Sequence, residues 1–311
     1  MRLTGSIGIG VRALLAAGIT GVTLLASAYV TIVFAAATIM FVAMQLGPFE
    51  FTETGFLWTL VIAAIPVLPC FAVVISHAIR LERLELLEGT VPASEIDADA
   101  IRALEAATTR LATQFDITEP EIRVRSDATP MAYTTTQPTD PVIAVRRRGS
   151  PVIVVSRGLV QTLSSDELEA VLAHECAHLA NDDLQFTSWL LVPLFAAEFL
   201  SDEDDPWRLD PLGWALTSVA LVGLGVFSRE RELAADRGAA EATGNPGALA
   251  SALERLADRR YRPSTDFRHA RSTNAITVMP TLGEEGDLGG LRSTHPPLEG
   301  RLEALRSLAA E

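Results

Sequence analysis

Two long uncharged segments dominate the N-terminal part of the chain. The first runs from Ala13 to Leu46 and the second from Phe56 to Ile79, with Gly47-Pro48 and an acidic connector between them. Each is longer than the roughly 20 apolar residues that a helix needs to cross a bilayer. The first also exceeds the apolar core of a cleaved leader. The pattern predicts a retained transmembrane hairpin within residues 1–80.

Arginines flank this predicted hairpin but are missing from its connector. Arg2 and Arg12 precede the first segment, and Arg80 and Arg83 follow the second. Because basic residues favour the cytoplasmic face, both ends of the hairpin should lie in the cytoplasm. The sequence therefore predicts a multi-pass protein of the plasma membrane, with residues 81–311 forming a domain that starts on the cytoplasmic side.

Beyond the hairpin, the hydrophobic period changes from helical to alternating. Two helices are expected at 79–88 and 94–115, followed by short β-prone segments at 121–125, 132–136, 142–145 and 152–155. We interpret these segments as a strand meander, with an edge strand that can align an extended peptide. The expected fold class is α+β, mostly α, with a small antiparallel or mixed β-sheet.

The second half of the chain reads as helical, with another apolar insertion. Ser164 or Ser165 caps a helix that should end at Asn181-Asp-Asp183, and apolar runs follow at 186–200 and 212–227. We interpret residues 186–227 as a second membrane hairpin; an apolar lid over the site is the alternative, because both runs are short for a span. Helices are expected at 230–241, 246–259 and 297–310, with a long loop over 262–292.

Charge and cysteine content restrict the function classes. The net charge is −14, and all 25 basic residues are arginines. Such an acidic chain is a poor partner for nucleic acid, and its lack of lysine is consistent with adaptation to high salt. The two cysteines, Cys70 and Cys176, indicate no disulfide framework.

The most informative motif is His174-Glu175-Cys-Ala-His178, an HExxH pattern within a predicted helix. Histidines four residues apart leave one face of a helix and can bind one Zn²⁺. Glu175 lies beside them, where a metallohydrolase needs a carboxylate to take a proton from the attacking water. An HExxH match can also arise by chance, so its surroundings must decide.

A catalytic zinc site usually has three protein ligands, so the two histidines need a partner. His269 and His295 are available imidazoles. Glu232 is the better candidate, because Asp236 shares its helix face and can accept a hydrogen bond from a ligand histidine. The alternative is that these two acids only form ion pairs with neighbouring arginines.

Three separated motifs resemble the M48 family of integral-membrane zinc metallopeptidases, in particular its HtpX-like branch, which is related to the CAAX prenyl proteases. They are HExxH, the pattern Ser228-Arg-x-x-Glu232-x-x-Ala-Asp236, and Thr294-His-Pro-Pro-Leu-Glu-Gly-Arg301. The resemblance implies a gluzincin-type domain with one Zn²⁺ per chain. It also implies Glu232 as the third ligand, Asp236 behind a ligand histidine, and His295 as a stabiliser of the oxyanion. For His295, a helix-capping turn is the structural alternative.

By this resemblance the expected function is a membrane-bound zinc endopeptidase that cleaves membrane or misfolded proteins on the cytoplasmic side, as part of protein quality control. Its partners would be protein or peptide substrates and the lipid bilayer. A CAAX prenyl-protein protease would share the catalytic residues but should have more membrane helices. A catalytically inactive membrane scaffold is the non-enzymatic alternative, which the intact motifs disfavour.

Overall fold

The computed structural model describes residues 3–46, 52–96, 98–141, 149–183, 210–257 and 296–310. Its helices are α1 (Leu3–Leu46), α2 (Glu53–Leu87), α3 (Asp99–Gln114), α4 (Arg157–Thr162), α5 (Ser165–Ala180), α7 (Asp210–Thr243), α8 (Pro246–Leu256) and α10 (Leu298–Ala309), with a 3₁₀ turn at Ala93–Glu95. Its strands are β1 (Thr90–Pro92), β2 (Glu121–Arg125), β3 (Ala132–Thr136) and β4 (Pro151–Ser156). The chain is mostly α with one small sheet, which confirms the expected fold class.

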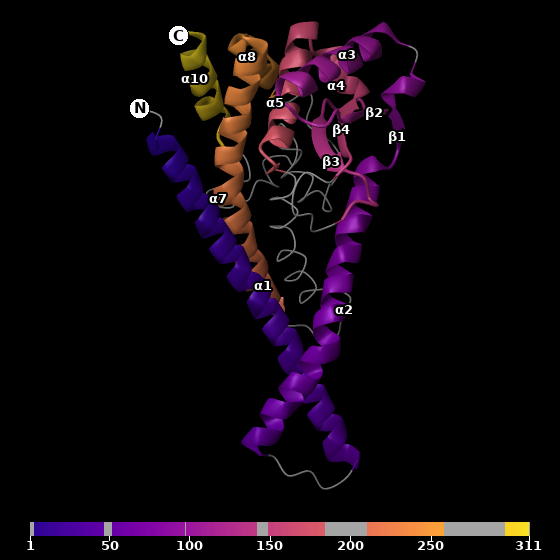
Figure 1. The fold of residues 1–311 in the computed structure, drawn as a ribbon, viewed down its shortest axis with the longest axis vertical. Helices are drawn as coiled ribbons and strands as arrows, with labels where there is room; N and C mark the ends of the chain where they lie inside the picture. The colour runs from indigo at the N-terminus through magenta and orange to yellow at the C-terminus, as the bar shows by residue number, and fades with distance from the viewer. Residues whose placement is uncertain are drawn as a thin grey trace.

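The first two helices form the predicted apolar hairpin. Within the described residues, Gly21–Leu46 and Glu53–Leu87 are long and apolar enough to cross a membrane, and only 22% and 17% of these windows is buried. A core helix of a soluble protein would be mostly covered, whereas apolar side chains on these helices face outward. The two helices cross near the end that carries their connector, away from the sheet (Figure 1).

Helix α2 does not stop where the apolar run ends. It continues through the charged residues after Ile79 to Leu87, so the separate helix expected at 79–88 is wrong. No residue in this stretch breaks a helix, and the end comes only before Gly89, whose φ of 69° favours glycine. The apolar hairpin therefore leads into the β-sheet through one continuous helix.

Two side chains of the sheet hold the end of α2. The backbone oxygen of Leu86 accepts a hydrogen bond from the Tyr133 hydroxyl at 2.6 Å and another from Arg125 Nη2 at 2.7 Å. Leu86, Met131 and Tyr133 also share a small buried cluster with β4. These contacts fix the hairpin against the same strands that lie beside the candidate site.

The four described strands form one mixed sheet in the order β1-β2-β4-β3. β2 runs parallel to β4, whereas β1 and β3 are antiparallel to their neighbours. The expected meander is therefore wrong. Strand β4 is the most apolar, and its residues Val152–Val155 are fully buried. It is one of the two inner strands, with β2, and the threonine-rich β3 lies at one edge of the described sheet. The strand expected at 142–145 falls outside the described residues.

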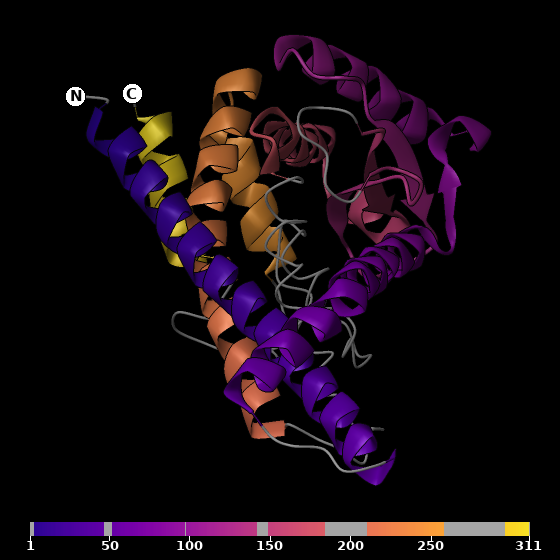
Figure 2. The ribbon, with the colours of Figure 1, turned by 60° about the horizontal axis from the view of Figure 1, so that its bottom comes forward.

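Helix α5 is the centre of the domain. Its start is a capping box, in which the Ser164 side chain accepts from the backbone of Glu167 and the Glu167 carboxylate accepts from the backbone of Ser164. Figure 2 shows α5 nearly end-on between α7 and α8 on one side and the sheet on the other. Eleven of its residues are buried, including both histidines.

Helix α7 joins two segments that the sequence suggested were separate. The apolar run at 212–227 and the helix at 230–241 form one helix from Asp210 to Thr243, which lies beside α1 over much of its length (Figure 1). It ends at Gly244, whose φ is 64°. Helix α10 packs on α8 and α7 and contributes Leu302 and Leu305 to the main core. The run at 186–200 and the loop at 262–292 lie outside the described residues.

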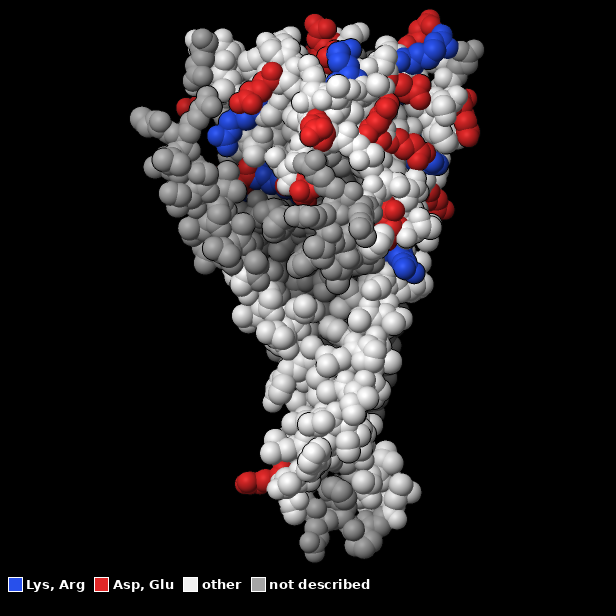
Figure 3. All heavy atoms as spheres, in the orientation of Figure 1, with Lys and Arg blue, Asp and Glu red and all other residues white. Residues whose placement is uncertain are grey.

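Charge is distributed unevenly over the molecule. On the face seen in Figure 3, acidic and basic side chains gather over the upper body, while the narrow stalk built by α1 and α2 is almost free of them. This division matches a water-exposed domain above an apolar hairpin.

Candidate metal centre

Helix α5 places His174, Glu175 and His178 side by side in the interior. The first two are fully buried and His178 is 5% exposed. The two imidazoles meet edge to face, and their Nε2 atoms lie 3.0 Å apart. The one-turn separation expected from the motif therefore brings both Nε2 atoms to one point.

Helix α7 brings the Glu232 carboxylate to the same point. Glu232 Oε2 lies 3.5 Å from His174 Nε2, and Glu232 Oε1 lies 3.4 Å from His178 Nε2. One ligand atom from each of the three residues lies within 4.8 Å of the others, all three residues being buried. The set of two imidazoles and one carboxylate is a combination that binds catalytic zinc in proteins.

A glycine allows the two helices to approach so closely. A Cβ atom added to Gly238 of α7 would lie 3.0 Å from the Cβ of Ala177 on α5. Small residues are also buried on both helices: Ala173 on α5, and Ala235 and Ala239 on α7, are fully buried alanines. This narrow interface holds Glu232 and Asp236 within reach of the histidines.

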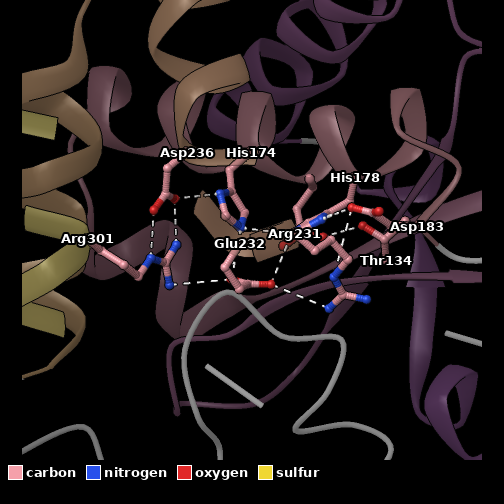
Figure 4. A network of polar contacts seen from close by, with 9 residues as sticks. Thr134, His174, His178, Asp183, Arg231, Glu232, Asp236 and Arg301 are labelled. Carbon is pink, nitrogen blue, oxygen red and sulfur yellow. Dashed lines mark hydrogen bonds and ion pairs between the residues drawn. The ribbon is translucent and has the colours of Figure 1, made fainter. Parts of the chain in front are cut away.

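Each histidine is backed by a separate aspartate. Asp236 Oδ1 lies 3.0 Å from His174 Nδ1, and Asp183 Oδ2 lies 2.7 Å from His178 Nδ1 (Figure 4). A carboxylate at Nδ1 favours the tautomer that leaves Nε2 unprotonated for a metal. Both Nε2 atoms are therefore oriented toward Glu232.

Asp183 is a site residue that sequence reasoning missed, because Asn181-Asp-Asp183 reads in the sequence only as a helix stop. The chain turns back there because Asp182 adopts a φ of 57°, which returns Asp183 to the last turn of α5. The sequence did show an acidic residue five positions after His178. It did not show the left-handed conformation of Asp182 that brings this acid back to the histidine.

We expect Asp183→Asn to weaken metal binding without unfolding the domain. The neutral amide accepts the Nδ1–H hydrogen bond more weakly than the carboxylate does, and loss of such a partner lowers metal affinity roughly 10- to 100-fold. Competition with a chelator would measure the Zn²⁺ dissociation constant, and Asp182→Asn is the matched control one residue away. Equal affinities in the two variants would contradict a role for Asp183.

Two buried arginines complete the cluster. Arg301 of α10 makes two hydrogen bonds to Asp236, from Nε at 2.8 Å and from Nη2 at 2.7 Å. Arg231 of α7 lies 3.4 Å from Glu232 through Nη2 and 3.9 Å from Asp183 through Nε. Although burial opposes ionisation, Arg301 holds the pKa of Asp236 below its usual range. Arg301 appeared in the sequence only as the end of a motif.

The charges of the buried cluster favour a divalent cation. Four carboxylates face two guanidinium groups, those of Glu175, Asp183, Glu232 and Asp236 against Arg231 and Arg301. Burial raises the pKa of Glu175. Burial lowers the pKa of His178, but Glu232 and Asp183 outweigh this and raise it to about 9. A metal ion would balance the excess negative charge and would compete with protons for its ligand atoms, as metal binding to protein ligands commonly does. The residues present therefore fit a divalent metal.

Glu175 is held by the edge strand of the sheet. The Thr134 hydroxyl donates a short hydrogen bond to Glu175 Oε2, and Thr134 is itself 1% exposed. Among the described residues, no donor reaches the other oxygen, Oε1, although that atom is buried. A buried oxygen of this kind normally has a partner such as water. One oxygen is thus fixed by the protein, and the other can accept a proton from the attacking water.

Removing this hydroxyl should slow turnover selectively. We expect Thr134→Val to lower kcat about 10-fold, because a hydrogen bond to a charged group contributes about 1.5–3 kcal/mol. KM and zinc content should stay the same, since the Thr134 hydroxyl bonds to Glu175 and not to one of the three metal-ligand candidates in the hydrogen bonds of the described residues. Steady-state kinetics would test this, with Thr134→Ser restoring activity and Thr136→Val as the control on the same strand. A wild-type kcat in the Thr134→Val enzyme would contradict the role.

The remaining sequence candidates have different outcomes. His295 and His269 lie outside the described residues, so the expected oxyanion role of His295 stays a prediction. Cys176 is fully buried in the main core, and burial raises its pKa to about 12.

Comparison with known proteins gives a consistent result. The model of peptidase family M48 matches residues 100–309. The chain is 34% identical to a protease HtpX homolog of Moorella thermoacetica, over 70% of this chain and 76% of the relative. It is also 34% identical to protease HtpX homolog 1 of Streptomyces coelicolor, over 67% and 71% of the two chains. A homolog from Methanopyrus kandleri is 33% identical over 69% of both chains.

The matched range begins in α3 and ends in α10, so it contains the whole described cluster. The relatives carry the name of a protease, and the family match covers more than half of the chain. The chain belongs to peptidase family M48 and is an HtpX-like, membrane-associated metalloprotease.

Proposed function

We propose that this protein is a membrane-bound zinc endopeptidase that hydrolyses peptide bonds of membrane or misfolded proteins at the cytoplasmic face. The proposal rests on one observation: His174, His178 and Glu232 come together beside Glu175. The Glu175 carboxylate is hydrogen-bonded to the protein through one of its two oxygens. A zinc ion held by the first three residues would polarise the scissile carbonyl and acidify the attacking water.

The protein's own groups supply the proton transfers. Glu175 Oε1 accepts the proton of the attacking water while Thr134 keeps the other oxygen in place. The carboxylic acid then protonates the nitrogen of the leaving amine, which completes hydrolysis. Asp183 and Asp236 hold the two imidazoles in orientation throughout.

An extended substrate would bind along β3. This strand has a single neighbour, β4, among the described strands, and it carries the threonine that contacts Glu175. A peptide that adds to a sheet edge is aligned by backbone hydrogen bonds rather than by its side chains. Such binding suits a protease that acts on many unfolded sequences.

The arrangement of the hairpin supports a cytoplasmic site. The start of α1, the end of α2 and helix α5, which carries both histidines, lie at the same end of the molecule (Figure 1). The arginines that flank the hairpin favour the cytoplasm for that end. We propose that residues 1–80 anchor the chain and residues 81–311 form the peptidase domain, with residues 186–227 as a second apolar hairpin.

Substrate choice and topology can both be measured. Purified protein in detergent should cleave unfolded casein and leave a farnesylated CAAX peptide intact; the reverse preference would favour a prenyl-protein protease.

The membrane orientation can be tested by labelling. A cysteine introduced at exposed Glu254, in a variant whose native cysteines are replaced by serines, should react with an impermeant maleimide only from the cytoplasmic side. Labelling from outside in intact cells would contradict the orientation.

A further inference from the structure

Two buried arginines flank the Glu232 carboxylate on opposite sides, one near each oxygen (Figure 4). Arg301 Nη1 lies 3.5 Å from Oε2, and Arg231 Nη2 lies 3.4 Å from Oε1. Each oxygen also faces one histidine, because Oε2 lies near His174 and Oε1 near His178. The plane of the carboxylate is therefore defined by four neighbours.

The same arginines also bind the aspartates behind the histidines. Arg301 makes its two hydrogen bonds to Asp236, the acid behind His174. Arg231 lies 3.9 Å from Asp183, the acid behind His178. Each arginine thus links Glu232 to the carboxylate that orients one imidazole, by two hydrogen bonds on the Asp236 side and by a longer ion pair on the Asp183 side. The two links form a frame around the three ligand candidates.

We propose that Arg231 and Arg301 are positioning residues of the metal centre, which set the orientation of its three ligands through their fork geometry and not only through their charge. The guanidinium group offers several N–H donors in one plane, so it can serve two carboxylates at once. A lysine ammonium has the same charge but cannot span both acids in this way. This inference rests on the proposed function of the site.

The frame makes the C-terminal helix part of the metal centre. Arg301 is 1% exposed although it belongs to α10, which is anchored in the core by Leu302 and Leu305. Burial of a guanidinium is costly unless its donors are used. Here Asp236 accepts two hydrogen bonds from it, and Glu232 lies 3.5 Å away as an ion-pair partner. Despite the burial, these two carboxylates raise the pKa of Arg301 above its usual value.

Substitution by lysine separates geometry from charge. We would prepare Arg231→Lys and Arg301→Lys in the full chain, with Arg237→Lys on α7 and Arg306→Lys on α10 as controls from the same helices. Chelator competition would give the Zn²⁺ dissociation constant, and the visible spectrum of the Co²⁺-loaded protein would report ligand geometry. Thermal unfolding in the presence of a chelator would measure the stability of the metal-free protein.

We expect both test variants to raise the Zn²⁺ dissociation constant roughly 10- to 100-fold and to change the Co²⁺ spectrum, while the control variants match the wild type. Wild-type affinity and spectrum in both test variants would overturn the proposal. The arginines would then only balance the negative charge of the carboxylates. A lower unfolding temperature with unchanged metal affinity would also overturn it. If one test variant loses its helical circular dichroism, the other decides, because each arginine contacts Glu232.

The two proposals fail in different ways. A His174→Ala variant should lose Zn²⁺ binding if the metal centre is correctly assigned. If that variant binds Zn²⁺ like the wild type, the proposed function fails. If His174→Ala loses the metal but the lysine variants retain full affinity, only the arginine frame fails.

Discussion

Replacing Glu175 by glutamine should abolish peptide cleavage while leaving zinc in place. The glutamine side chain has nearly the same shape but cannot accept the proton of the attacking water. Loss of a general base costs about 10²- to 10⁴-fold in rate. The three proposed ligands are other residues, so metal content should stay at one ion per chain. Casein cleavage and metal analysis on the same preparation would measure both quantities.

A suitable control for this variant lies on the same helix. Glu169 of α5 forms an exposed ion pair with Arg110, and Glu169→Gln removes a charge of the same sign away from the cluster. This control should keep wild-type cleavage. Undiminished proteolysis by Glu175→Gln would contradict the assigned base, and loss of zinc from it would show that the glutamate is needed to form the site.

Replacing Glu232 by alanine should remove the metal itself. The remaining imidazoles of His174 and His178 provide only two ligands, fewer than the three that catalytic zinc sites usually have. The variant also leaves Arg231 and Arg301 beside each other without the carboxylate between them. We expect a zinc content well below one ion per chain after dialysis, and no detectable cleavage.

Glu241→Ala is the control for that measurement, because Glu241 is exposed near the end of the same helix, α7. It should retain zinc and activity. If Glu232→Ala instead kept one zinc ion per chain, the third ligand would have to come from His269 or His295. Alanine variants of those two histidines would then identify it.

The sequence could predict those parts of the site whose geometry is set by residue spacing on a single helix. His174 and His178 are one turn apart, and so are Glu232 and Asp236, so each pair shares a face whatever the fold. Which helices meet was not determined by spacing. The approach of α7 to α5 depends on Gly238 and a set of small residues. Before the structure, the two pairs were joined only by the need for a third ligand and by the resemblance to a family.

The contacts missed from sequence depend on turns and on long-range packing. Asp183 reaches His178 because of a left-handed residue at Asp182. Arg301 reaches Asp236 from a helix far along the chain. Thr134 reaches Glu175 from β3, an edge strand of the described sheet, and the predicted meander gave the wrong strand order. Strand composition could have suggested part of this order, since the valine-rich strand β4 is an inner strand.

The anchoring of the site to the membrane hairpin also came only from the structure. Tyr133 precedes Thr134 in β3, and its hydroxyl donates to the backbone of Leu86 at the end of α2. The strand that holds the catalytic carboxylate is therefore held in turn by a helix of the hairpin. Periodicity predicted the helix and the strand but not this contact between them.

Zinc titration of the metal-free protein tests the central claim most directly. Wild-type protein stripped with a chelator should have no casein-cleaving activity, and activity should rise with added Zn²⁺ to a maximum at one ion per chain. Glu175→Gln should bind the same amount of zinc without gaining activity. Cleavage that persists in the stripped protein, or saturates without zinc binding, would contradict the assignment of His174, His178 and Glu232 as a catalytic metal centre.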